Sequence, residues 1–248
     1  DYFNTNLWTG TGNAQTISGV GFQPDFNWSK CRSNSYAHQL IDSVRGITKQ
    51  LNSNDSESEG TNANGITAFN SDGYSIGTQP EFSNNGNTFA GWSWKAGTAV
   101  SGNTTGSGTY KTYTGSVSTT AGFSIIKYTG NGTAGHTIPH RLGAVPKMII
   151  VKRLNSADNW RTYHGSLGAT KALDLNNTGA ANTVGSSRWN DTEPTSSVFT
   201  VGTGSGVNAN NSTYIAYCFA EKTGYSKFGS YTGNGNANGT FVYTGFKP

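Results

Sequence analysis

Charged and hydrophobic residues are both scarce in this sequence. Of its 248 residues, 12% are Asp, Glu, Lys or Arg and 33% are hydrophobic. Helix-rich folds depend on Ala, Leu, Glu and Lys, so this composition disfavours them. Disorder is disfavoured as well, because disordered chains have high net charge and few aromatics. Here 17 Lys and Arg oppose 13 Asp and Glu, and 12% of the residues are aromatic.

Cysteines, long apolar runs and basic clusters are also few or missing. Cys31 and Cys218 are too few for a framework of several disulfides, and we expect two buried free thiols rather than one bridge. No apolar run approaches the roughly 18 residues of a membrane span, so we expect no membrane insertion. No run of five or more Lys and Arg occurs, so we expect no nucleic-acid partner. The opening Asp1-Tyr2-Phe3 is not typical of a signal peptide, which predicts a mature or excised soluble piece.

Glycine, small polar residues and aromatics make up the rest. The 34 glycines and pairs such as Asn64-Gly65 and Asp72-Gly73 favour tight hairpins. Apolar and polar residues alternate in Phe26-Asn27-Trp28-Ser29, as in a strand with one buried face. No window favours a helix, apart from one short turn over residues 53–60. The sequence therefore predicts an all-β protein.

An internal repeat predicts how this β-structure is organised. Residues 24–54 align with residues 146–176 at an offset of 122. After three more residues, Thr88-Phe89-Ala90-Gly91-Trp92-Ser93-Trp94 aligns with Thr213-Tyr214-Ile215-Ala216-Tyr217-Cys218-Phe219. Two tandem antiparallel β-sandwich domains from an internal duplication, of the jelly-roll or concanavalin A-like type, are therefore expected. Copy one covers residues 1–101, a Gly/Ser/Thr-rich flexible or edge-lying connector covers 102–121, and copy two covers 122–248.

The repeat begins a third time near the end of the sequence. An aromatic residue followed by Thr-Gly-x-Gly occurs at Trp8, Tyr128 and Tyr231, and each time a proline follows further on. A weaker copy of the motif is Tyr113-Thr114-Gly115-Ser116. Residues 224–248 are therefore read as the start of a third repeat, whose strand is free to pair with a neighbouring chain.

Aromatic residues outside the repeated strands are the best candidates for binding a ligand. Sugar rings stack on Trp and Tyr, while neighbouring polar groups bond to the hydroxyls. Trp28, Trp92 and Trp94 lie in core-like strands and are interpreted as structural. Polar neighbours predict exposure for two other tryptophans. The predicted ligand-binding residues are Trp160, Arg161, Trp189, Asn190 and Asp191.

Other reactive residues give weaker signals. The run Asp55-Ser56-Glu57-Ser58-Glu59 is interpreted as a solvated loop, although its alternating oxygens leave a structural Ca²⁺ open. His136 and His140 flank Pro139, which argues against a metal site on a helix, so both are expected at the surface. We predict no catalytic residues, no metal ligands and no other cofactor.

Several separated motifs together resemble a known kind of repeat. They are residues 22–30, 42–46, 69–74 and 92–97 in copy one, and 147–152, 194–199, 214–221 and 225–235 in copy two. They resemble repeats of structural and tail-fibre-like proteins of tailed bacteriophages, especially from marine samples. The resemblance covers nearly the whole chain and implies lectin-like sandwiches on a virion, outside the cell. It brings no established catalytic residues, and Cys31 departs from it, because a polar residue is expected there.

Three functions are compatible with these observations. The first is a non-enzymatic structural and adhesive module of a phage appendage or virion surface. Its partners would be a host-surface glycan or receptor, other virion proteins and further copies of itself. The second is a self-assembling fibre or particle-coat protein without a ligand. The third is a glycan depolymerase, which needs a carboxylate pair in a groove, and no pair stands out in the sequence.

Overall fold

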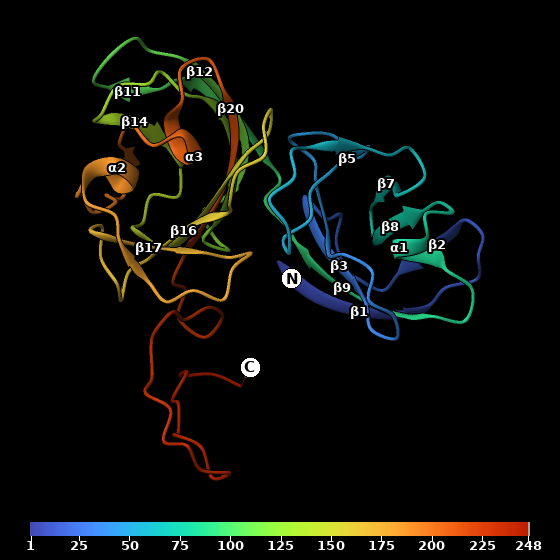
Figure 1. The fold of residues 1–248 in the computed structure, drawn as a ribbon. Helices are drawn as coiled ribbons and strands as arrows, with labels where there is room; N and C mark the ends of the chain where they lie inside the picture. Colours follow the sequence, from blue (N-terminus) through green and yellow to red (C-terminus); the bar gives the residue numbers. More distant parts are fainter. Residues whose placement is uncertain (248) are drawn as a thin grey trace.

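The regular secondary structure of the chain consists mainly of antiparallel sheets. A computed structural model describes residues 1–247, which form strands β1 to β20 and helices α1 to α3 of four residues each (Figure 1). The predicted all-β class is confirmed. The helices α1 (Pro80–Ser83), α2 (Ser186–Trp189) and α3 (Ser205–Asn208) were not predicted, and the turn expected over residues 53–60 is not a helix.

The first half of the chain contains two larger sheets and a short hairpin. One sheet has the order β1-β9-β3-β4, and the other has the order β2-β8-β7. The strands are β1 (Phe3–Thr9), β2 (Gln15–Ser18), β3 (Phe26–Cys31), β4 (Gln39–Asp42), β5 (Lys49–Gln50), β6 (Gly60–Thr61), β7 (Ile66–Asn70), β8 (Gly73–Ile76) and β9 (Thr88–Trp94). Strands β5 and β6 form the hairpin. Ile17, Ile41, Tyr74 and Phe82 form part of the core of this half.

The second half is built around an eight-stranded sheet. Its order is β10-β12-β13-β20-β15-β16-β17-β18, and a smaller sheet has the order β11-β14-β19. The strands are β10 (Thr98–Asn103), β11 (Thr105–Gly106), β12 (Thr112–Ser118), β13 (Phe123–Thr129), β14 (His136–Pro139), β15 (Pro146–Arg153), β16 (Arg161–His164), β17 (Lys171–Asp174), β18 (Asn182–Thr183), β19 (Val198–Val201) and β20 (Thr213–Ala220). Tyr128, Ile149, Trp189 and Tyr214 are among its core residues.

The two large sheets share one arrangement of strands. The order β1-β9-β3-β4 in the first half corresponds to β13-β20-β15-β16 in the second. The register agrees too, since Phe3 lies opposite Trp94 where Phe123 lies opposite Phe219. Strands β10 and β12 have no counterpart in the first half within the described residues. The expected connector 102–121 thus contains the end of β10 and β12, which lie at one edge of the eight-stranded sheet, and β11, which belongs to the smaller sheet.

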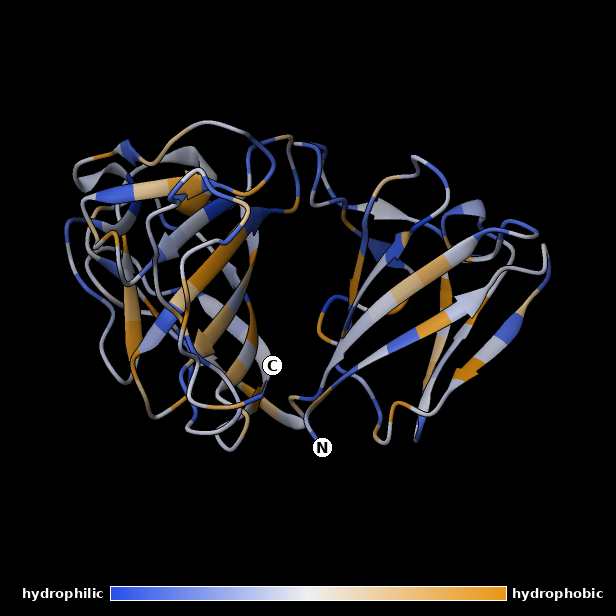
Figure 2. Ribbon diagram, turned by 90° about the horizontal axis from the view of Figure 1, so that it is seen from below, coloured by the Kyte–Doolittle hydropathy of each residue, from blue (hydrophilic) through white to orange (hydrophobic). Residues whose placement is uncertain are grey.

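The large sheets of the two halves face each other (Figures 1 and 2), and a hydrophobic layer joins them. Side chains that point away from each half's own core meet there, and the rings of Phe26 and Tyr217 stack with centroids 4.4 Å apart. Buried residues of both halves contribute to this layer, including Leu40, Leu51, Ile125 and Ile215. The chain therefore has one hydrophobic core in each half and a third between them.

Candidate functional site

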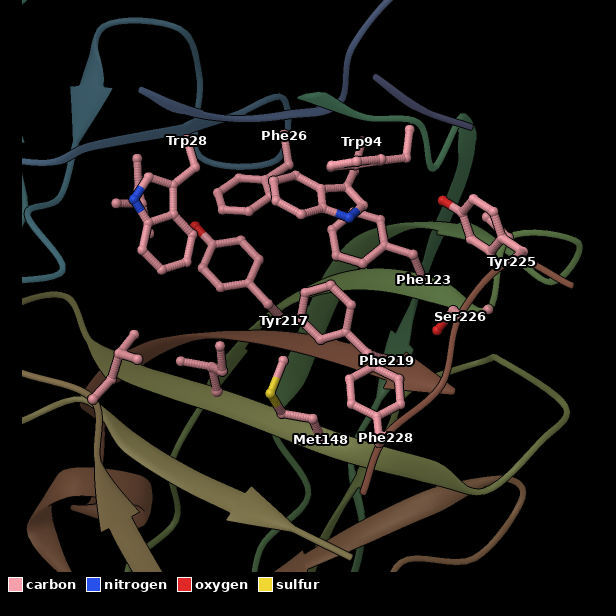
Figure 3. A pocket seen from close by; sticks show the side chains of 16 residues that line it. Phe26, Trp28, Trp94, Phe123, Met148, Tyr217, Phe219, Tyr225, Ser226 and Phe228 are labelled. Atoms are coloured by element: carbon pink, nitrogen blue, oxygen red, sulfur yellow. The ribbon is translucent and has the colours of Figure 1, made fainter. Parts of the chain in front are cut away.

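An apolar cavity lies at the junction between the two halves. Its volume is about 290 Å³, and its walls are mainly aromatic (Figure 3). The lining residues are Phe3, Phe26, Trp28, Leu40, Trp94, Ala121, Gly122, Phe123, Met148, Ile150, Leu175, Tyr217, Phe219, Tyr225, Ser226 and Phe228. We refer to this cavity as the junction pocket. Both halves of the chain and the segment after β20 contribute to it.

Strand alternation accounts for the aromatic walls. Successive side chains of a strand point to opposite faces. On β3, Phe26 and Trp28 therefore face the second half, while the buried Asn27 and Ser29 bond to each other on the opposite face at 2.6 Å. On β20, Tyr217 and Phe219 face the pocket in the same way.

Neighbouring rings hold one another in place around the pocket. Phe3 lies 4.9 Å from Trp94, and Phe123 lies 5.0 Å from Phe219, measured between ring centroids. Both pairs are tilted, a geometry that aromatic rings favour over a face-to-face sandwich. Phe3 is 38% exposed and Trp94 is partly buried, so the pocket opens to solvent on this side.

The segment after β20 forms another wall of the pocket. A turn places Tyr225 and Phe228 there: the amide of Lys222 donates to the carbonyl of Ser226, and the amide of Phe228 donates to Glu221 Oε1. The ring of Phe228 lies 6.3 Å from that of Phe219. Burial raises the pKa of Tyr225 to about 12, so its hydroxyl stays protonated near neutral pH and can donate a hydrogen bond.

The pocket is suited to ring-shaped or apolar groups. None of its lining residues, all within the described part of the chain, is charged, and Ser226 and the tyrosine hydroxyls are its main polar groups. A dry cavity of about 150 Å³ can hold benzene, so this pocket has room for one substituted six-membered ring. Aromatic walls bind the flat C–H face of such a ring.

A buried polar network adjoins the pocket through Tyr217. The hydroxyl of Tyr217 donates to Asp42 Oδ2 at 2.7 Å, and Arg45 Nε donates to the same oxygen at 2.5 Å. The Asp42 and Arg45 side chains are fully buried. Burial favours loss of the proton from Arg45, but Asp42, Tyr217 and Glu59 together outweigh it and raise the Arg45 pKa. For Tyr217 burial acts in the opposite direction and raises the pKa of the hydroxyl well above its ordinary value. The network joins the two halves at one wall of the pocket.

The exposure predicted for Trp160 and Trp189 is wrong. Trp160 is 0% exposed at the junction and Trp189 is 2% exposed in the second core, where it packs edge-on against Tyr163. In this conformation neither ring has a free face for stacking on a sugar. The polar residues around Trp160 misled the prediction because they bond to one another: Arg161 pairs with Asp158 at 2.5 Å and with Asp174 at 2.7 Å.

Asn190 and Asp191 lie directly after α2. Both adopt the left-handed conformation, with φ of 53° and 47°, and Asp191 is exposed. Arg188, one residue before Trp189, lies 3.9 Å from Asp174, which also pairs with Arg161. The structure thus brings the two predicted segments together through Asp174, and none of the five predicted residues lines the junction pocket. Ligand binding by Trp160, Arg161, Trp189, Asn190 and Asp191 stays a prediction.

The surface position predicted for His136 and His140 is also wrong, because both are 0% exposed. His136 lies on β14, with its ring nitrogens 3.0 Å from Asn208 Oδ1 and 2.6 Å from Thr104 Oγ1. The amide of Leu142 donates to His140 Nδ1, which leaves His140 Nε2 to donate to the carbonyl of Thr195. Burial lowers the pKa of His136, and it lowers that of His140 to about 4.

The buried His140 predicts a loss of stability in acid. The ordinary histidine pKa of 6.5 applies to His140 in the unfolded chain. Between that pH and pH 4, the unfolded state therefore binds a proton that the folded state does not bind. The free energy of unfolding should therefore fall by about 3 kcal/mol between pH 6.5 and pH 4 from this residue alone. Urea unfolding across this range measures the effect. His140→Gln keeps one donor and one acceptor and should show a shallower pH dependence; an unchanged dependence would contradict the assignment.

The acidic loop expected in solvent lies partly at the junction. Glu59 reaches Arg45 at 3.3 Å, and the carboxylate of Asp55 accepts bonds from Asn52 and from the amide of Glu57. Among residues 1–247, no group of three or more His, Cys, Asp or Glu side chains is placed to hold a metal ion. A structural Ca²⁺ in this loop stays a prediction.

Two further features bear on the expectations from composition. Cys31 and Cys218 are both buried free thiols, as predicted. Burial raises the pKa of Cys218 to about 12, which keeps this thiol protonated and unreactive. In the part of the chain that the structure describes, no helix has the length and apolar character needed to cross a membrane.

The pocket residues were missed from sequence because each resembles ordinary core. Trp28 and Trp94 were interpreted as structural, and Tyr217 and Phe219 occupy the positions that correspond to Trp92 and Trp94 in the repeat. The sequence feature that could have revealed the pocket is that both copies place large rings on the same face of equivalent strands. Two such faces can bury each other, and any imperfect fit between them leaves a pocket.

One of the comparisons with known proteins identifies a family for this chain. No curated protein and no solved structure matches the chain. One family matches residues 1–248 of this sequence. The description of that family is Domain of unknown function (DUF7483). The chain, with its two large sheets packed around an aromatic pocket, therefore belongs to the DUF7483 family.

Proposed function

We propose that this protein is a non-enzymatic structural and adhesive module of a virion or other particle surface, and that the junction pocket holds a ring of a host-surface glycan. The observation that carries the proposal is the pocket itself: both halves supply rings to it, and its lining has no charged side chain in the described residues. Such walls fit the C–H face of a sugar, while Ser226 and Tyr225 can bond to its hydroxyls.

The construction of the protein also supports a structural role. Its two large sheets bury each other's aromatic faces, and the Asp42–Arg45–Tyr217 network adds hydrogen bonds across the same junction. We propose in addition that the halves derive from duplication of one jelly-roll or concanavalin A-like sandwich. Their shared strand order and register support this origin.

Replacing Trp94 should weaken glycan binding by about fivefold, because its indole forms one aromatic wall and stacking on such a ring contributes on the order of 1 kcal/mol. The wild-type protein and Trp94→Leu would be compared on an array of bacterial surface glycans. Phe241→Ala is the matched control, since Phe241 is 85% exposed and does not line the pocket. Retention of the wild type by no glycan at any density would overturn the adhesive role.

The single methionine offers a direct test of where the glycan binds. The sequence contains one methionine, Met148, and it lines the pocket (Figure 3). Protein labelled with ¹³C at the methionine methyl should give one resonance, which shifts when a retained glycan is added. A glycan that binds without moving this resonance would overturn the pocket as the binding site. This measurement needs no substitution, so it does not depend on how Trp94→Leu folds.

A further inference from the structure

The two large sheets differ at one edge. Strands β1 and β13 are equivalent: each has seven residues and pairs antiparallel with the last long strand of its half. The outer edge of β13 is covered by β12, with Tyr113 opposite Tyr128 and Gly115 opposite Ile126. Within residues 1–247, β1 pairs only with β9. The edge that β12 covers in the second half is therefore open in the first.

The open edge has the features of a strand acceptor. Leu7 on β1 is 64% exposed, so this edge strand presents an apolar side chain to solvent. The amide of Thr5 donates to the side chain of its neighbour Asn4 at 2.8 Å, so this amide points away from β9. Exposed edge strands are usually blocked by charge, proline or a bulge, and β1 (Phe-Asn-Thr-Asn-Leu-Trp-Thr) has no charge or proline.

The segment after β20 repeats part of the sequence of β12, the strand that covers β13. Tyr231-Thr232-Gly233 repeats Tyr113-Thr114-Gly115 of β12. The glycine matters, because a Cβ at Gly115 would lie 2.4 Å from the carbonyl oxygen of Ile125. Gly233 has nothing within 4 Å, and Tyr231 is 69% exposed. In the described part of the chain no strand follows β20, so this segment is free to form one.

We propose that residues 231–236 of one copy add to the open edge of β1 in a second copy, as β12 adds to β13. The register of β12 places Tyr231 opposite Trp8, Gly233 opposite Asn6 and Asn234 opposite Thr5. Trp8 stacks on Phe89 at 5.4 Å in the first core, so Tyr231 would extend that core as Tyr113 extends the second. Donor and acceptor lie on different surfaces of one copy, and such contacts produce open chains of copies.

Chain length favours a second copy over the same copy. Phe228 and Phe3 both line the junction pocket, so residue 228 lies at the Phe3 end of β1. The five residues from Phe3 to Trp8 span roughly 17 Å of strand. The three residues from Phe228 to Tyr231 reach at most about 11 Å. While Phe228 stays in the pocket, this short reach favours Trp8 of a second copy as the partner of Tyr231.

The first test is the association of the full chain, measured by sedimentation velocity over a range of concentrations. The wild type should form dimers and longer species as concentration rises. Gly233→Val should weaken this association at least tenfold, because the added side chain clashes as it would at Gly115. Gly239→Val is the matched control, since Gly239 also has open space around it and lies outside the proposed strand. A wild type that stays monomeric, or an unchanged Gly233→Val, overturns the proposal.

A second test fixes the register and the donor. Thr5→Cys and Asn234→Cys, made in separate chains and mixed under oxidising conditions, should form a disulfide between the two chains. Opposed residues in a ladder lie within the Cα separation that a disulfide requires. Failure of the mixed chains to cross-link overturns the proposed pairing. So does a disulfide within one monomer of the double variant, because it would place the donor on its own β1. Neither test involves the junction pocket, so glycan binding and self-association can fail independently.

Discussion

Asp42→Ala should lower the free energy of unfolding by about 3–5 kcal/mol, because it leaves the buried charge of Arg45 without its partner. Both side chains are fully buried, and the Asp42 carboxylate accepts four bonds: from Arg45 Nε, from the Tyr217 hydroxyl, and from the amides of Val44 and Arg45. Arg45 would keep only Glu59 at 3.3 Å as an ionic partner. Urea unfolding followed by tryptophan fluorescence measures the loss.

Removing both charges separates the ion pair from simple loss of packing. Replacing a buried ion pair with apolar residues is often neutral or stabilising, so Asp42→Ala combined with Arg45→Met should recover a large part of the stability. Asp191→Ala is the control for removing a carboxylate, because Asp191 is exposed, and it should change stability by less than about 0.5 kcal/mol. A double variant as unstable as Asp42→Ala would show that the charge of Arg45 is not the cause.

The network was beyond sequence reasoning because its members are far apart in the chain. Asp42 and Tyr217 are separated by 175 positions and belong to different halves. The repeat aligned Tyr217 with Trp92 within a strand, which correctly placed its ring on the same face as Phe219. It said nothing about what that face would meet. Contacts between two repeats do not leave a periodic pattern in either one.

The strand predictions were correct where the local alternation of apolar and polar residues determines the structure. Phe26 to Cys31 alternates between pocket and core, and Thr88 to Trp94 pairs in register with Phe3 to Thr9. The prediction failed for His136 because it treated Pro139 as the mark of a surface turn. Pro139 is instead the last residue of β14, and strands β11 and β19 flank that strand on both sides. Neighbouring strands, rather than the local residues, bury His136.

Trp160→Ala should lower the free energy of unfolding by about 3–5 kcal/mol, the usual cost of truncating a buried tryptophan. Trp160 is 0% exposed, and its indole nitrogen donates to the carbonyl of Asn52 in the other half at 2.9 Å. Further bonds lie in the same contact region. The amide of Asp158 donates to the carbonyl of Ser56. The ammonium of the buried Lys152 donates to the carbonyl of Ser56 and to the carbonyl of Asp158. Losing the indole therefore leaves a cavity and an unpaired carbonyl at the junction.

Trp189→Ala is the matched comparison, because Trp189 is equally large and buried but lies within the second core. Both variants should lose similar stability by urea unfolding. Hydrogen exchange should distinguish the two variants. Trp160→Ala should speed exchange of the amides in residues 51–59 through local opening. In Trp189→Ala these amides should exchange only when the whole variant unfolds. Trp160→Phe keeps most of the ring and should cost less than the alanine variant. If Trp160→Ala lost less than about 1 kcal/mol and left residues 51–59 unchanged, the indole of Trp160 would not be one of the contacts that hold the two halves together.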